Sequence, residues 1–180
     1  MSYDLNVLCF MQKKKVKLLP FPSPFDFKVY HKGKNSYPKY YGDTWYFMEK
    51  CSGFLYYLFP KEEIFGETWG CGDLCDTHHV ARPAPTNHCL PDELAEHVSE
   101  LNTVIWIKKK YIHDFERIIN YFLSESPANM IIFLPRFQDH ERGIVHGVIS
   151  RNQFFSMMKN KKIRLNMCYI IRKWYTEFLP

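Results

Sequence analysis

The first third of the chain holds short, aromatic-rich apolar runs separated by proline and glycine, with no amphipathic helical pattern between them. Residues 3–10, 27–30, 40–48 and 54–59 are such runs, and each suits a β-strand. Parallel strands need crossover connections of a dozen or more residues, usually helices. Because helical crossovers are missing here, we expect mainly antiparallel pairing rather than a doubly wound parallel sheet.

Helical patterns begin only in the second half. Pro91, followed by Asp92 and Glu93, is typical of a helix start, because proline and acidic residues suit the first turn. Residues 109–123 carry an apolar stripe at helical spacing and stop before Pro127. A third, short helix is expected after Ser150, which forms a capping-box pattern with Gln153.

Further strands are expected between and after these helices, at residues 103–107, 130–134, 143–149 and 163–174. The last is the longest, with alternating apolar residues from Ile163 to Ile171. Strands followed by mixed strands and helices predict an α+β fold with a largely antiparallel sheet and about three helices. A chain of 180 residues is expected to form a single globular domain, residues 1–180.

The composition excludes several classes of protein. Hydrophobic residues make up 46% of the chain and charged residues 24%, which is typical of a globular protein rather than a disordered one. The longest apolar runs, such as residues 54–59, are far shorter than the roughly 20 residues of a membrane helix. The N-terminal residues lack the pattern of a secretory signal. We therefore expect a cytoplasmic protein with no membrane partner.

A cluster of cysteine and histidine occurs at residues 69–89. Cys71 and Cys75 have a spacing seen in zinc knuckles. The other two ligands could come from His78, His79, His88 and Cys89, of which His88 and Cys89 form the second pair. However, the second pair is adjacent rather than spaced as a chelating turn. A surface loop without metal is the alternative, and the sequence leaves the zinc question open.

No motif predicts catalysis. The chain has no Gly-x-Ser-x-Gly nucleophile elbow and no glycine-rich phosphate loop, and Cys51 has no assignable base. Cys9, Cys51 and Cys168 lie beside apolar residues and are expected to be buried in the core. We therefore expect no enzyme activity, no catalytic residues, no cofactor and no small-molecule substrate.

Three basic clusters suggest nucleic-acid binding as one class of function. Lysines gather at residues 13–17, 108–110 and 159–162, and aromatic residues near turns offer stacking surfaces. The hypothesis requires these clusters to share a face. A formal net charge of only +5 argues against nucleic acid as the partner.

The C-terminal half carries a resemblance to a known group of proteins. Residues 126–174 contain a strand, then Gly147-Val148-Ile149-Ser150 leading into a helix with Phe154 and Phe155, then a closing strand. The aromatic block at residues 40–57 adds to the pattern. This arrangement resembles bacterial immunity proteins of contact-dependent growth inhibition and related polymorphic toxin–antitoxin systems.

The resemblance implies a cytoplasmic, non-enzymatic inhibitor that binds and neutralises a cognate toxin domain, such as a nuclease, by protein–protein contact. An inhibitor of a basic nuclease is expected to present acidic groups. The predicted contacts lie in residues 69–82 and on the polar face of the helix that begins at Pro91. They are Trp69, Asp73, Asp76, His78, His79, Arg82, Glu93, Glu96 and Glu100. The alternative is a nucleic-acid-binding module with a zinc-organised loop.

Overall fold

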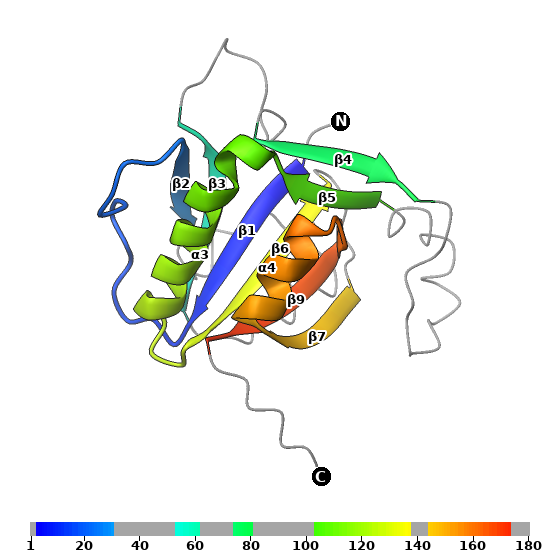
Figure 1. The fold of residues 1–180 in the computed structure, drawn as a ribbon. Coiled ribbons are helices and arrows are strands. Elements are labelled where there is room, and N and C mark those ends of the chain that lie inside the picture. The colour runs from blue at the N-terminus through cyan, green and yellow to red at the C-terminus, as the bar shows by residue number, and fades with distance from the viewer. Residues whose placement is uncertain (1–2, 31–52, 62–73, 81–102, 138–143, 174–180) are drawn as a thin grey trace.

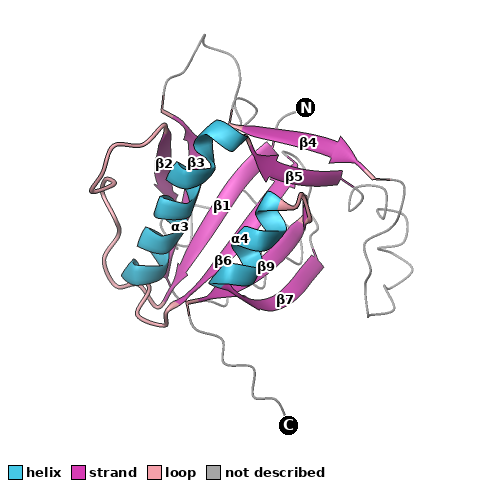
Figure 2. Cartoon of the chain, in the orientation of Figure 1, coloured by secondary structure: helices cyan, strands magenta, loops and turns pink. Residues whose placement is uncertain are grey.

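The computed structural model describes residues 3–30, 53–61, 74–80, 103–137 and 144–173 (Figure 1). Within them the chain forms a six-stranded sheet, a three-stranded sheet and two α-helices. Both helices lie on one face of the larger sheet (Figure 2). The fold is therefore α+β, as predicted. The helix expected from Pro91 and the strand expected at residues 40–48 fall outside the described residues.

The six-stranded sheet has the order β2-β3-β1-β6-β9-β7. Its strands, in chain order, are β1 (Tyr3–Phe10), β2 (Phe25–Tyr30), β3 (Gly53–Pro60), β6 (Met130–Phe137), β7 (Ile144–Ser150) and β9 (Met167–Arg172). All neighbouring pairs are antiparallel except β7 and β9. That parallel pair is joined through a helix, the crossover that parallel strands require. The predicted antiparallel character is therefore correct for four of the five pairings.

The two helices form where the sequence predicted them. The 3₁₀ turn η2 (Lys109–Tyr111) leads into α3 (Ile112–Glu125), and α4 (Arg151–Lys159) follows β7. The Ser150 hydroxyl accepts the backbone N–H of Gln153, and the Gln153 side chain accepts the N–H of Ser150, so the predicted capping box is present. Two α-helices are thus described where about three were expected.

The three-stranded sheet joins β4 (Cys75–His79), β5 (Thr103–Ile107) and the short β8 (Ile163–Arg164), in that order and antiparallel. It lies at the top of Figure 1, where α3 begins and α4 ends. Within the cysteine- and histidine-rich segment, residues 75–79 form β4, a strand that was not predicted from the sequence. Cys75 of this strand is buried, whereas Asp76, Thr77 and His78 are exposed and polar, so neither an apolar run nor an alternation marks the strand.

The expected single strand at residues 163–174 is wrong. The segment divides into β8 and β9, which belong to different sheets, with a turn at Leu165 and Asn166 between them. Asn166 has φ 60°, a left-handed conformation that asparagine tolerates better than most residues. Ile163, Leu165, Met167, Tyr169 and Ile171, the apolar residues at every second position, are all buried on both sides of this turn, so the sequence pattern alone conceals the break.

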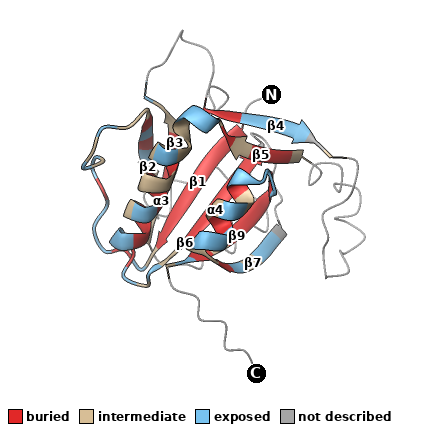
Figure 3. Cartoon of the chain, in the orientation of Figure 1, coloured by how far each residue is buried: buried red, intermediate tan, exposed pale blue. Residues whose placement is uncertain are grey.

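A main core fills the space between the six-stranded sheet and the two helices, and it extends into the three-stranded sheet. In β1, alternate residues such as Leu5, Val7 and Cys9 belong to this core. Figure 3 shows β1, β6 and β9 coloured mainly as buried. The reverse face of the large sheet is buried as well, around Leu8, Leu55 and Ile132. β6 is buried on both faces, because its residues from Ile131 to Leu134 are all buried.

Candidate interaction surface

The described cysteines do not form a reactive site. Cys9, Cys75 and Cys168 are free thiols buried in the interior, as predicted for Cys9 and Cys168. Burial raises the pKa of the Cys9 and Cys75 thiols, and a protonated thiol is a poor nucleophile and a poor metal ligand. In the part of the chain that the structure describes, no three His, Cys, Asp or Glu side chains gather as a metal site.

Cys75 bears directly on the zinc hypothesis. Its side chain joins the main core beside Leu74 and Ile107, on the opposite side of β4 from Asp76. This placement argues against Cys75 as a zinc ligand. Of the other candidate donors, His78 and His79 belong to β4, and Cys71, His88 and Cys89 lie outside the described residues.

Three of the nine predicted contact residues fall within the description, and all three belong to β4. Asp76 and His78 are exposed, and His79 ends the strand. Trp69, Asp73, Arg82, Glu93, Glu96 and Glu100 lie outside the described residues. The structure therefore places part of the expected surface on an edge strand of the small sheet.

The small sheet has one face in the core and one face turned away from it. Ile105 and Ile107 of β5 join the main core, so Trp106 between them belongs to the opposite face. Cross-strand pairing sets Asp76 beside Trp106, and His78 and Arg164 on either side of Val104. We call the side chains of Asp76, His78, Trp106, Lys161 and Arg164 the Trp106 face.

Trp106 is the centre of this face. Its ring is partly buried against the edge of the main core, and the Lys161 ammonium lies 4.2 Å from the ring centroid. Asp76, the cross-strand neighbour of Trp106, has its Oδ1 3.9 Å from Lys108 Nζ. A cation over an indole contributes about 0.5–1 kcal/mol at an exposed site. The indole is thus held in place while part of it stays accessible.

Lys161 adopts a backbone conformation that lysine normally avoids. Its φ is 56°, at the position after the end of α4 where glycine is preferred. The N–H groups of Lys161 and Lys162 donate to the carbonyls of Met158 and Met157, which completes a Schellman motif. A strained residue whose side chain covers a partly exposed tryptophan is the kind of local conflict often found at functional sites.

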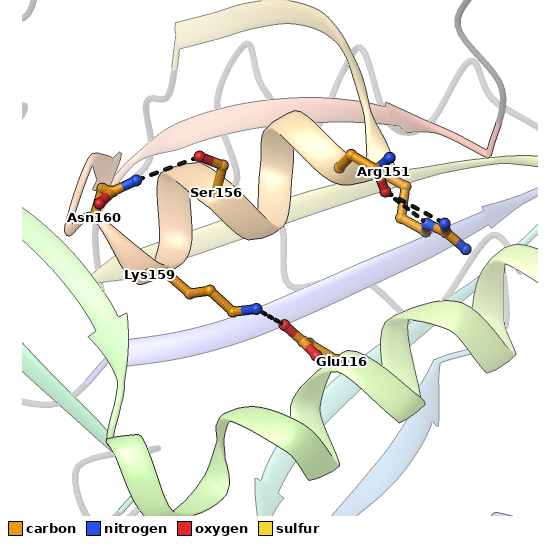
Figure 4. Close-up of polar contacts among 6 residues, drawn as sticks. Glu116, Arg151, Ser156, Lys159 and Asn160 are labelled. Carbon is orange, nitrogen blue, oxygen red and sulfur yellow. Dashed lines mark hydrogen bonds and ion pairs between the residues drawn. The ribbon is translucent and has the colours of Figure 1, made fainter.

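Two of the three lysine clusters meet beside Trp106. Lys108 contacts Asp76, the cross-strand neighbour of Trp106, and Lys161 contacts Trp106 itself. Lys159 reaches from α4 to α3, with Nζ 2.7 Å from Glu116 Oε1 (Figure 4). The clusters at residues 108–110 and 159–162 therefore form one basic region with Arg164.

The third cluster, residues 13–17, lies at the other end of α3. The Ser126 hydroxyl, just past the helix, donates to the Phe10 carbonyl at the end of β1. At 1.5 Å per residue, α3 separates this point from the Trp106 face by about 21 Å. The requirement that all three basic clusters share a face is therefore met by only two of them.

Sequence reasoning did not identify Trp106 or Lys161 as surface residues. The strand predicted at residues 103–107 contains Trp106, whose position between two inward isoleucines indicates an outward side chain. Lys161 was read as one lysine of a charged run. Its contact with Trp106 joins residues 55 positions apart, for which no local pattern exists.

Comparisons of the chain with protein-family models, with curated proteins and with solved structures gave no match. No described helix has both the length and the apolar character needed to cross a membrane.

Proposed function

We propose that this protein is an immunity protein that binds and neutralises a bacterial toxin domain, and that the Trp106 face is part of its contact surface. The observation that carries the proposal is that two of the predicted contact residues, Asp76 and His78, share one sheet face with a partly exposed tryptophan. Such an inhibitor needs a preformed recognition surface rather than catalytic groups.

The residue types on this face support a protein partner. Tryptophan and arginine are enriched among the few residues that dominate binding energy, because they bury a large area with few rotatable bonds. Trp106 is already held by the core and by Lys161, so binding costs little additional side-chain entropy. The backbone under this face is held in place by the pairing of β4, β5 and β8.

The charge of the face indicates the chemistry of the partner. Lys161, Arg164 and the neighbouring Lys108 outnumber Asp76. The described surface is therefore basic where the sequence led us to expect acidic contacts. We infer that the toxin presents an acidic surface here, which would speed association at low salt.

The test uses the protein encoded immediately upstream of the gene for this chain, which the proposal predicts to carry the toxin domain. Co-expression should restore growth to cells that make the toxin domain, and purified proteins should form a complex measurable by calorimetry. Trp106→Ala should weaken the complex at least about 30-fold, the effect of losing a hot spot of about 2 kcal/mol. No rescue of growth and no complex would reject the immunity function.

Two further variants separate binding from folding. Lys161→Glu reverses an exposed charge on the Trp106 face and should weaken the complex without unfolding the protein. Arg172→Ala changes an exposed cation at the end of β9, away from this face, and should leave affinity unchanged. If Lys161→Glu and Arg172→Ala changed the affinity equally, the Trp106 face would not be the interface, although the immunity function would still stand.

The gathering of two lysine clusters around Trp106 favours a second candidate, a nucleic-acid-binding module, because single strands bind where cations surround an aromatic platform. A labelled oligonucleotide of mixed sequence should then bind with an affinity that falls steeply from about 50 to 200 mM salt. Trp106→Ala and Lys161→Glu should both weaken it. Absence of binding at low salt would remove this candidate.

A further inference from the structure

We propose that the connection between β1 and β2 is a docking surface for anionic lipid membranes. This segment, residues 11–24, is called the strap. Its sequence, MQKKKVKLLPFPSP, contains four lysines and no acidic residue. The proposal does not depend on the immunity function, because the lysines of the strap lie toward the end of α3 that is far from the Trp106 face.

The strap is held to the body of the protein along its inner side. Val16 is buried, and its backbone N–H donates to the Tyr56 hydroxyl at 2.9 Å. Phe21 packs edge-on against Tyr121 of α3, and the Arg117 guanidinium lies 4.2 Å from the Phe21 ring centroid. Three prolines restrict the second half of the segment. The outer side is therefore presented in a defined conformation.

Cations and aliphatic side chains together make up the outer side. Leu18 and Met11 are 70% and 58% exposed, more than any other large hydrophobic side chain in the described residues. The four lysines of residues 13–17 are exposed too, and none of them forms an ion pair with another described residue. Leu18 follows the last of these lysines directly.

This combination fits a lipid surface better than a nucleic acid. Single-stranded nucleic acids need aromatic rings for base stacking, and the strap's aromatic ring, Phe21, is turned inward against α3. Lysines meet anionic headgroups, and an adjacent leucine enters the boundary with the acyl chains. The expectation of no membrane partner came from the absence of a spanning segment, and lying on a membrane needs none.

The test is co-sedimentation of the full chain with vesicles of phosphatidylcholine, with and without phosphatidylserine. Binding should require phosphatidylserine and weaken with salt. Because each lysine near an anionic surface contributes about fivefold to partitioning, Lys14→Gln with Lys15→Gln should reduce binding about 25-fold. Leu18→Ser should reduce it by about tenfold. All three positions are exposed, so the variants should unfold like the parent protein.

The matched control is Lys109→Gln with Lys110→Gln, which removes two exposed lysines at the other end of α3 and should not affect vesicle binding. Equal loss in this control would mean a diffuse charge effect and would overturn the proposal. Binding to neutral vesicles would do the same. A labelled oligonucleotide held by Lys14 and Lys15 but indifferent to Leu18→Ser would instead identify a polyanion site.

Discussion

The Tyr56 hydroxyl is buried between two partners that belong to the strap. It donates to Gln12 Oε1 at 2.6 Å and accepts the backbone N–H of Val16 at 2.9 Å. Burial raises the pKa of Tyr56, so the hydroxyl keeps the proton it donates. One side chain of a central strand thus fixes the first half of a long connection.

Tyr56→Phe should therefore lower the free energy of unfolding by about 1–3 kcal/mol, because it leaves the Gln12 oxygen and the Val16 N–H buried without their partner. Urea denaturation monitored by circular dichroism measures this change. Tyr121→Phe is the control, since its partly buried ring packs against Phe21 and Phe122 and would be retained. A loss below about 0.5 kcal/mol for Tyr56→Phe would show that water replaces the hydroxyl.

His146 is a residue whose protonation the fold opposes. It lies at a bulge in β7 and is exposed, but its ring centroid lies 4.8 Å from that of Tyr169, and desolvation of the ring lowers its pKa from 6.5. The folded state therefore binds a proton less readily than the unfolded state. Stability contributed by this group is fully present above pH 6.5 and is lost as the pH falls through the lowered pKa.

The NMR titration of the His146 ring should accordingly have its midpoint below pH 6.5. His146→Gln should flatten the decline of unfolding free energy on the acid side of that value, measured as denaturation midpoints at several pH values. A midpoint at or above 6.5 would mean that the ring is solvated in solution.

At the scale of elements, α4 is closed at both ends by hydrogen bonds, but only one end is visible in the sequence. Ser150 and Gln153 form the predicted capping box. The Schellman motif at the other end has Lys161 where glycine is usual, so no sequence signal marks it. The cation–π contact of Lys161 with Trp106 offsets part of the cost of its left-handed backbone conformation.

A pair of substitutions separates the strain at Lys161 from its contact. Lys161→Ala and Lys161→Gly both remove the ammonium from Trp106, but only glycine relieves the left-handed conformation. Lys161→Gly should therefore be about 1 kcal/mol more stable than Lys161→Ala. Thermal unfolding measures the difference, and Lys162→Ala and Lys162→Gly serve as the matched pair. Equal stability of Lys161→Ala and Lys161→Gly would show that residue 161 does not keep its left-handed conformation in solution.

At the scale of the whole molecule, one main core connects the helices with both sheets. The Phe154 ring of α4 lies 5.1 Å from Phe133 of the large sheet and 6.2 Å from Phe115 of α3, between ring centroids. Ile105 and Ile163 of the small sheet belong to the same core. The two sheets should therefore lose their structure together rather than as separate units.

Phe154→Ala should lower the free energy of unfolding by about 3–5 kcal/mol, because the ring is fully buried. Amide hydrogen exchange should accelerate in β1 and in β5 alike. Phe155→Ala, which removes the partly buried neighbour, should cost less. Faster exchange in β9 with no change in β5 would show that the small sheet is stabilised independently.

The described fold was predictable wherever local periodicity decides structure. The strand at residues 3–10, the helix stripe from Ile112 to Phe122 and the Ser150 cap each follow from side chains a few positions apart, and the structure confirms them. The candidate surface was only partly predictable. Asp76 and His78 were named, but their strand, its partner and Trp106 beside them were not.

What the sequence determined by itself is the α+β class, the antiparallel character and the elements that carry a period of 2 or 3.6. Only the tertiary structure decided that residues 163–174 divide between two sheets, that Cys75 points inward, and that Lys161 covers Trp106. The physical reason is the same in each case. These features depend on contacts between residues far apart in the chain, whose free energy exists only after the core has formed.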